Sequence, residues 1–173
     1  MALTLATHNP AYTYSGQVLV SYIFTDSRPP KGVAGYVDWL MDGQISDLII
    51  KNKVKGSLGE SLLLVTGSKI YAHFLLIIGA GNPKKLRLRM LKEIGKCTAK
   101  VLNGLRVSHY GLYPHNLFLS HLDKFKIMDE LFDGLKSTSN EKIQVTILSD
   151  DYKQQDIIMK WLRDKTYILK PKD

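Results

Sequence analysis

The stretch Asp26–Leu48, with the sequence DSRPPKGVAGYVDWLMDGQISDL, decides how this chain folds. It follows an apolar run, Val18–Phe24, that is typical of a buried strand, and its paired prolines stop that strand because proline cannot donate to a sheet ladder. Apolar residues then recur three and four positions apart, which places them on one face of a helix: Val33, Tyr36, Val37, Leu40 and Met41. Gly43 ends this predicted helix, and a second apolar face begins at Ile45.

Strands and helices alternate along the rest of the chain. Strands are predicted over residues 17–24, 61–66, 73–78, 105–112 and 142–148, with a short edge strand at 3–5. A hairpin turn at Gly67-Ser68 leads into a return strand that we expect to begin at residues 69–71. Helices are predicted over residues 83–102 and after N-caps at Ser120 and Ser149.

Crossovers of this length connect parallel neighbours. The pattern therefore predicts an α/β protein with one domain over residues 1–173. Its three layers, α/β/α, surround a mixed, mostly parallel sheet of about six strands.

Composition limits the setting of the protein. Of the 173 residues 45% are apolar, as in globular proteins, and no apolar run approaches the roughly 20 residues that cross a bilayer. The N-terminal residues do not have the pattern of a secretory signal. A lone cysteine, Cys97, is expected to be a buried thiol. These features predict a cytoplasmic protein with no membrane partner.

The motif in residues 26–48 resembles the N-terminal domain of the dizinc leucyl aminopeptidase family. The resemblance is carried by Asp-x-Arg-Pro, Lys-Gly-x-Ala-Gly, Asp-Trp and Gly-x-Ile-Ser-x-Leu, and it extends more loosely over residues 74–102. It implies a fold like that of the macro domain. The motif residues are expected to serve structure or an interface: Asp26, Arg28, Pro29, Gly32, Gly35, Asp38, Trp39 and Gly43. We expect Asp26 and Arg28 to hold the strand-to-helix turn by an Asx-type bond and an ion pair.

The resemblance also implies what this chain does not do. The family carries its zinc ions, catalytic lysine and acidic ligands in a C-terminal domain, and the sequence ends before such a domain could begin. No His-Glu-x-x-His, Cys-x-x-Cys or Gly-x-Ser-x-Gly motif occurs, and the histidines at 109, 115 and 121 are expected to be ordinary surface or capping residues. We therefore expect no catalytic residue, no metal and no cofactor. The family assembles as hexamers, so the expected partner is another copy or an aminopeptidase.

Two further segments suggest ligand binding. The turn Gly79-Ala80-Gly81-Asn82 lies between an apolar strand and a helix, where phosphate or an ADP-ribose-type nucleotide can bind, although a tight structural turn is the favoured reading. The sequence has a net charge of +8, and residues 84–100 hold seven basic residues against one acidic residue. Five of them are spaced along one helix face and predict either a solvated surface or sequence-blind nucleic-acid binding: Lys85, Arg89, Lys92, Lys96 and Lys100.

Overall fold

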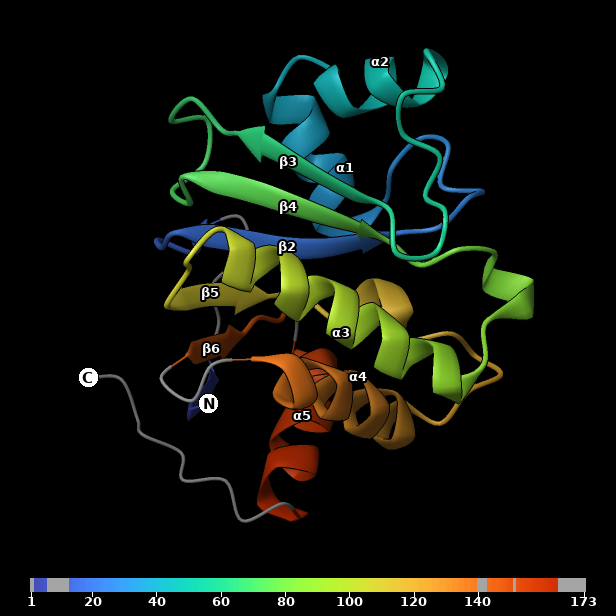
Figure 1. Ribbon diagram of the computed structural model, residues 1–173, viewed down its shortest axis with the longest axis vertical. Coiled ribbons are helices and arrows are strands. Elements are labelled where there is room, and N and C mark those ends of the chain that lie inside the picture. The colour runs from blue at the N-terminus through green and yellow to red at the C-terminus, as the bar shows by residue number, and fades with distance from the viewer. Residues whose placement is uncertain (1, 6–12, 140–142, 151, 165–173) are drawn as a thin grey trace.

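A computed structural model describes residues 2–5, 13–139, 143–150 and 152–164 of the chain (Figure 1). One sheet of six strands has the order β1-β6-β5-β2-β4-β3. The strands are β1 Ala2–Leu5, β2 Val18–Ile23, β3 Ser61–Val65, β4 Phe74–Gly79, β5 His109–Leu112 and β6 Gln144–Ile147. All neighbours pair in parallel except β3, which is antiparallel to β4. The predicted mixed, mostly parallel sheet is confirmed.

Helices cover both faces of the sheet, which confirms the three-layer prediction. One face carries α1 Gly32–Leu40 and α2 Gln44–Ile50, and the other carries α3 Leu88–Gly104, α4 Lys124–Thr138 and α5 Tyr152–Asp164 (Figure 1). Two short 3-10 helices, η2 Pro83–Lys85 and η3 His115–Leu117, lie in the connections. Each face of the sheet has its own apolar core. Within the described residues, no helix is long and apolar enough to cross a membrane.

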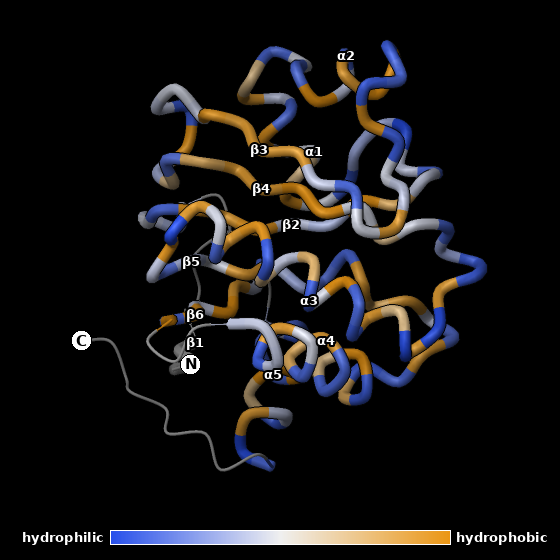
Figure 2. The backbone as a smooth tube through the Cα atoms, viewed as in Figure 1, coloured by the Kyte–Doolittle hydropathy of each residue, from blue (hydrophilic) through white to orange (hydrophobic). Residues whose placement is uncertain are grey.

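Strand β2 is central because both cores depend on it. All six of its residues are buried. Val18, Val20 and Tyr22 pack in the core under α3 and α4, whereas Leu19 and Ile23 pack under α1. A parallel strand covered on both faces has to be apolar at nearly every position, and Figure 2 shows β2 among the hydrophobic strands that form the middle of the molecule.

The hairpin between β3 and β4 has a longer loop than the sequence predicted. Strand β4 begins at Phe74 rather than at residues 69–71. The Thr66 hydroxyl donates to the carbonyl oxygens of Ala72 (2.5 Å) and His73 (3.1 Å), and the Thr66 N–H also donates to the His73 carbonyl (3.2 Å). These bonds close a loop over residues 67–73, so the return strand starts later.

Two helix starts also differ from prediction. The helix expected from Pro83 begins only at Leu88, because the Asn82 side chain accepts from the Lys84 N–H and shapes the separate turn η2. Helix α4 is capped by Asp123 rather than Ser120, with the Asp123 carboxylate accepting from the Lys126 N–H at 2.9 Å. Phe125, in the first turn of this helix, is 37% exposed.

Helices α3 and α4 cross with their backbones in close contact at two glycines. A methyl group placed on Gly95 would overlap the Leu131 carbonyl oxygen and lie 2.9 Å from the Leu135 nitrogen. A methyl on Gly134 would overlap the Lys92 carbonyl oxygen. Glycine is therefore required at both positions so that α3 and α4 can pack this closely.

We predict that Gly95→Ala lowers the free energy of unfolding by about 1–3 kcal/mol, because the added methyl forces α3 away from α4. The higher helix propensity of alanine offsets this by about 1 kcal/mol at most. Urea denaturation measures the effect. Gly104→Ala is the matched control, since Gly104 ends the same helix with nothing within 4 Å of an added methyl. Equal stability of the two variants would contradict the close packing of α3 against α4.

Candidate functional site

The turn after β2 is held by a serine rather than by the predicted Asp26–Arg28 pair. The Ser27 hydroxyl accepts from the Phe24 N–H at 3.0 Å, and the Ser27 N–H donates to the Phe24 carbonyl at 3.0 Å. Asp26 and Arg28 are joined only through their backbones, by a hydrogen bond of 2.9 Å, and no ion pair among the described residues includes either of them. The expectation of an Asx-type bond and an ion pair at this turn is therefore wrong.

Asp38 joins α1 to α2 from a nearly buried position. Its carboxylate accepts from the Ser46 N–H at 2.9 Å and from the Ser46 hydroxyl at 2.5 Å. Gly43, between the two helices, has a φ of 79°, a left-handed conformation that suits glycine. These contacts fix the corner between the helices, because a free N–H in the first turn of α2 is satisfied by a side chain of α1.

Trp39, the next residue, points the other way and is 71% exposed. The Tyr36 ring lies beside it, with ring centroids 5.8 Å apart. These aromatic side chains belong to an open groove of about 790 Å³. We call it the α1 groove, and it is lined by Pro29, Pro30, Gly32, Gly35, Tyr36, Asp38, Trp39, Asp42 and Gly43. Six of the eight family-motif residues therefore line one surface feature, and Asp26 and Arg28 do not.

Close to this groove, a second hollow of about 270 Å³ continues the apolar surface. It is lined by Arg28, Pro29, Pro30, Ser46, Ile49 and Ile50. The Ile50 side chain is 75% exposed, and both hollows share the two prolines. The rim of α1 and α2 thus exposes two large apolar side chains above a base that Asp38 holds rigidly.

Asn116 lies in η3, just after β5, at the carboxyl edge of the sheet where ligands gather in open α/β folds. Its Nδ2 donates to the carbonyl oxygens of Tyr22 (2.7 Å) and Lys31 (3.3 Å). Gly32 has a φ of 59°, and a methyl group there would overlap the Asn116 Oδ1. The side chain of Asn116 therefore ties the end of β2 to the start of α1 and occupies the space between them.

The predicted glycine turn is also used for packing. The backbone N–H groups of Gly79, Ala80 and Gly81 donate to the carbonyl oxygens of Glu60 (2.7 Å), Ile23 (2.7 Å) and Gly56 (2.9 Å). A methyl on Gly79 would overlap the Ser57 carbonyl, and Gly81, with a φ of 76°, lies against Leu58. All three N–H groups have protein acceptors, so they do not form an anion-binding nest. Only Asn82 is exposed, and its side chain accepts from the Lys84 N–H.

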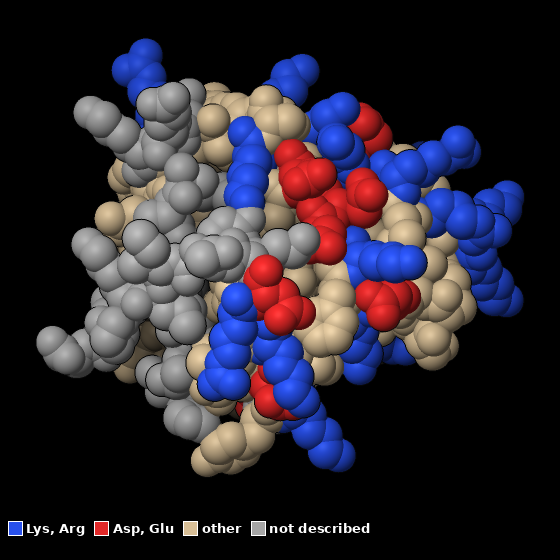
Figure 3. Space-filling model, turned by 90° about the horizontal axis from the view of Figure 1, so that it is seen from below, with Lys and Arg blue, Asp and Glu red and all other residues tan. Residues whose placement is uncertain are grey.

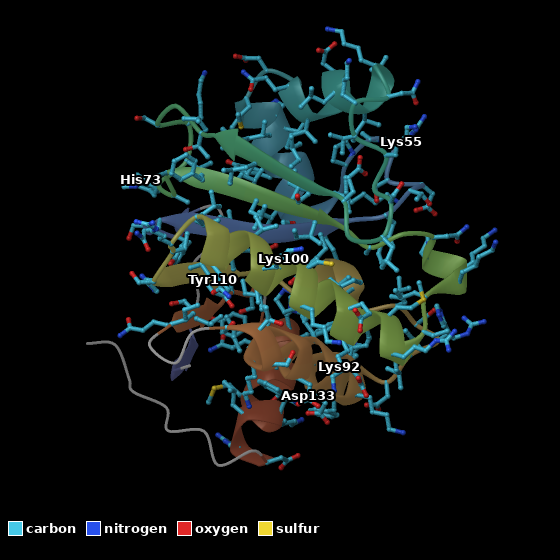
Figure 4. The ribbon with its side chains drawn as sticks, viewed as in Figure 1. Lys55, His73, Lys92, Lys100, Tyr110 and Asp133 are labelled. Atoms are coloured by element: carbon cyan, nitrogen blue, oxygen red, sulfur yellow. The ribbon has the colours of Figure 1, made fainter. Side chains whose placement is uncertain are left out.

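The basic stripe is divided between two structural elements. Lys85 lies in η2, whereas the other four residues lie on α3. Lys96 pairs with Glu93 at 2.9 Å, and Lys92 lies 3.9 Å from Asp133 of α4 (Figure 4). Seen from below, acidic side chains lie between lysines and arginines, and the basic side chains gather at the edge where Figure 1 places η2 (Figure 3). Two of the four stripe residues on α3 therefore lie beside an acidic side chain.

The remaining candidate groups for chemistry are dispersed. His109 Nε2 lies 3.2 Å from the Tyr14 hydroxyl and 3.1 Å from the Thr146 hydroxyl, whereas the His115 ring packs on Phe118 with centroids 4.6 Å apart. No three His, Cys, Asp or Glu side chains come together as metal ligands within the residues that the structure describes. Cys97, expected to be buried, is only partly so, and its sulfur lies 3.2 Å from a methyl placed on Gly59.

Two buried tyrosines lie in the core beneath α3. Burial raises the pKa of both Tyr22 and Tyr110 well above the usual value of a phenol, so both hydroxyls stay protonated at neutral pH. Figure 4 places Tyr110 on β5 under α3, far from the α1 groove. Both hydroxyls are buried in the core and do not line an exposed site.

Comparison with known proteins identifies the family. The sequence model described as "Cytosol aminopeptidase family, N-terminal domain" matches residues 18–122, which is more than half of the chain. The chain belongs to this family. The matched segment contains the whole α1 groove and Asn116.

Among its relatives, a protein named "Probable cytosol aminopeptidase" from Pseudomonas syringae is 28% identical over 145 residues, covering 76% of this chain and 29% of the relative. A protein of the same name from Shewanella sediminis is 31% identical over 126 residues, covering 67% of this chain and 25% of the relative. The chain thus spans less than a third of the length of these relatives.

Solved structures show the same fold at low identity. A mutant of the Oceanobacillus iheyensis macrodomain has a TM-score of 0.72 at 11% identity and covers 94% of this chain and 92% of its own. The same macrodomain solved with ADP has a TM-score of 0.70, also at 11% identity, covering 91% of this chain and 88% of its own. A mutant of tomato leucine aminopeptidase has a TM-score of 0.66 at 12% identity, covering 93% of this chain and 35% of its own. The macro-like fold implied by the motif is confirmed.

Sequence reasoning missed Ser27 and Asn116, and it quoted Ser46 within the Gly-x-Ile-Ser-x-Leu string without giving it a role. Ser27, Ser46 and Asn116 each make a hydrogen bond that defines a turn, a helix corner or the link between β2 and α1. Serine and asparagine are common in turns for many reasons, so their types alone did not single them out. The one available signal was the position of Asn116 shortly after a predicted strand, where a parallel sheet has its carboxyl edge.

We predict that Asn116→Asp destabilises the protein by about 2–3 kcal/mol and more than Asn116→Ala does. The aspartate turns two acceptor oxygens toward the carbonyls of Tyr22 and Lys31, which then lose their donor in a partly buried place. Thermal and urea denaturation at pH 7 compare the two variants. If Asn116→Asp were as stable as the unmodified protein, the amide would not be holding these carbonyls.

Proposed function

We propose that this protein is a non-catalytic interaction module whose α1 groove binds a partner protein. The observation that carries the proposal is the exposure of Trp39, 71%, beside Tyr36 on a rigid helix. Tryptophan and tyrosine are the residue types that most often supply binding energy at protein interfaces. A soluble domain that exposes them without a partner keeps an unfavourable apolar surface in water.

The backbone beneath the groove is preorganised for binding. Asp38 fixes the α1–α2 corner through Ser46, so a partner that contacts Trp39 does not have to order the backbone beneath it. Of the two aspartates that line the groove, Asp38 is turned inward to Ser46, and Asp42 lies 3.7 Å from Lys69. The exposed aromatic rings can stack on an arginine or lysine of a partner segment.

The partner we propose is a full-length aminopeptidase of the same family. The support is that the groove is built from the family motif and lies inside the segment that the family model matches. If this chain and the aminopeptidases carry the same motif on an exposed surface, binding of the same kind of partner explains why both carry it. We propose the cytoplasm as the setting, in keeping with the name of the family and with a lone cysteine.

The proposal assigns no peptidase chemistry to this chain. The matched model is that of the N-terminal domain, and no metal-ligand cluster occurs among the described residues. Hydrolysis of leucine p-nitroanilide by the purified chain with Mn²⁺ or Zn²⁺ would contradict this part of the proposal.

We predict that Trp39→Ala weakens binding to a purified full-length cytosol aminopeptidase at least about tenfold, because it removes the largest exposed aromatic anchor. Biolayer interferometry measures the dissociation constant, and circular dichroism checks the fold. Tyr152→Ala is the matched control, since Tyr152 is 76% exposed but lies on α5, outside the groove. Neither substitution adds or removes a charged residue, so the net charge is the same in both variants.

Other results would favour the alternative functions. Binding of ADP-ribose or of a mononucleotide, measured by calorimetry and lost in Gly81→Val, would support a ligand site at residues 79–82 despite the hydrogen bonds there. DNA binding that falls steeply with salt and is lost in Lys92→Glu with Lys96→Glu would support the basic stripe. Either result, together with no binding of aminopeptidase, would overturn the proposed function.

A further inference from the structure

The hollow of about 270 Å³ beside α2 combines apolar walls with one charged residue, and we call it the α2 hollow. Pro29, Pro30 and Ile50 line it together with Ile49, which is 4% exposed and belongs to the core under α1. Figure 1 shows α2 at the outer end of the molecule, where a partner can approach it. The α2 hollow is thus an exposed apolar surface that lies directly on the core.

Arg28 is the one charged residue that lines the α2 hollow among the residues that the structure describes, and it is exposed. Within that part of the chain its guanidinium makes no ion pair and no side-chain hydrogen bond. Asp26 reaches it only through the backbone. A guanidinium can hold a carboxylate by two parallel hydrogen bonds, so the hollow offers an anion a partner that the protein itself does not use.

The other polar side chain of the hollow is already engaged. The Ser46 N–H and hydroxyl both donate to the Asp38 carboxylate. The side-chain donors that remain for a ligand are therefore those of Arg28. The rest of the lining is apolar, so a ligand that matches it carries one acidic group next to an apolar group.

We propose that the α2 hollow binds a segment of a partner protein in which an apolar side chain stands next to an aspartate or glutamate. The apolar side chain packs against Pro29, Pro30 and Ile50, and the carboxylate pairs with Arg28. The inference rests on the proposed function in taking a protein as the occupant, and it adds the chemistry of the segment that is bound.

The size and the position of the α2 hollow favour a protein segment over a small molecule. Small-molecule sites usually have about 300–1,000 Å³ and enclose most of the ligand, whereas this hollow is smaller and suits a side chain. It shares Pro29 and Pro30 with the α1 groove, so one extended segment can cross the prolines and also reach Trp39. Pockets that take successive side chains are typical of surfaces that bind extended peptides.

The two parts of the proposed contact reinforce each other. An ion pair on an open surface contributes little, because water screens both charges. An apolar side chain that covers Ile50, which is 75% exposed, removes water from beside Arg28 and so strengthens the pair with the carboxylate. For an isolated short peptide we expect a dissociation constant of roughly 0.1–1 mM.

NMR titration of the ¹⁵N-labelled protein with short peptides tests the proposal. The probe is a capped peptide of glycine and serine with Leu-Glu at its centre. We expect the backbone N–H signal of Ile50 and the Nε–H signal of Arg28 to shift. A matched peptide with Leu-Gln should bind at least about threefold more weakly, since a neutral amide cannot form the charge-assisted pair. No shift of either signal with the Leu-Glu peptide at about 5 mM would overturn the proposal.

Charge reversal separates recognition at Arg28 from an effect of net charge. Arg28→Glu should weaken binding of the Leu-Glu peptide at least about fivefold and should allow a Leu-Lys peptide to bind, because the pair is restored with opposite signs. Arg163→Glu is the matched control, since Arg163 is exposed on α5 and the net charge changes equally. Equal weakening in the two variants would contradict a carboxylate site at Arg28.

Ile50→Ser tests the apolar part of the site. It should weaken the Leu-Glu and Leu-Gln peptides alike, at least about threefold, because it removes an exposed apolar wall. Val65→Ser is the matched control, since Val65 is 70% exposed but lies on β3. Octanoate serves as a small acid with an apolar tail. If octanoate bound as tightly as the Leu-Glu peptide, the hollow would be a site for small carboxylic acids, and the proposed protein segment would be rejected.

These measurements are separate from the test of the proposed function. Trp39→Ala should weaken binding of the aminopeptidase and leave the peptide titration unchanged, because Trp39 does not line the α2 hollow. Peptide binding without aminopeptidase binding would support this site and remove the proposed partner. Aminopeptidase binding that depends on Trp39, without any peptide binding, would support the partner and overturn this site.

Discussion

The burial of β2 on both faces is the constraint on which the rest of the structure depends. Its odd and even positions enter two separate cores, and its two neighbours, β4 and β5, both pair with it in parallel. A strand in that position accepts no exposed or charged residue. Helices must then cover each face of the sheet. Both α1 and α3 therefore pack where they shield the six residues of β2 from water.

The carboxyl edge of the sheet, where this architecture usually leaves room for a ligand, is used here for internal contacts. Asn116 ties the end of β2 to the start of α1, and the loop around Ser57 covers the turn at Gly79. The resemblance to macrodomains is thus a resemblance of fold. The exposed apolar surface of this chain lies away from the carboxyl edge of the sheet. It occurs on the rim of α1 and α2 and along the edge strand β3.

Asp38 and Trp39 show how adjacent motif residues divide their roles. Successive residues on a helix point about 100° apart, so one can face the protein while the next faces water. Asp38 turns inward to Ser46, and Trp39 turns outward into the α1 groove. The glycines of the motif have equally separate roles: Gly32 makes room for Asn116, and Gly35 lies against the Pro30 carbonyl. A surface suited to binding and the supports beneath it are thus encoded within one short stretch.

The sequence by itself determined the family motif, the order of strands and helices, and the α/β class, because these follow from hydrophobic periodicity and from turn residues that act over a few positions. It did not determine which polar groups meet across long separations. Asn116 reaches Tyr22 and Lys31 from more than 80 residues away, and the loop at Ser57 packs on Gly79. Only the tertiary structure decided these contacts, and with them the exposed tryptophan and the position of β3 at the edge of the sheet, because each depends on how separate segments come together in space.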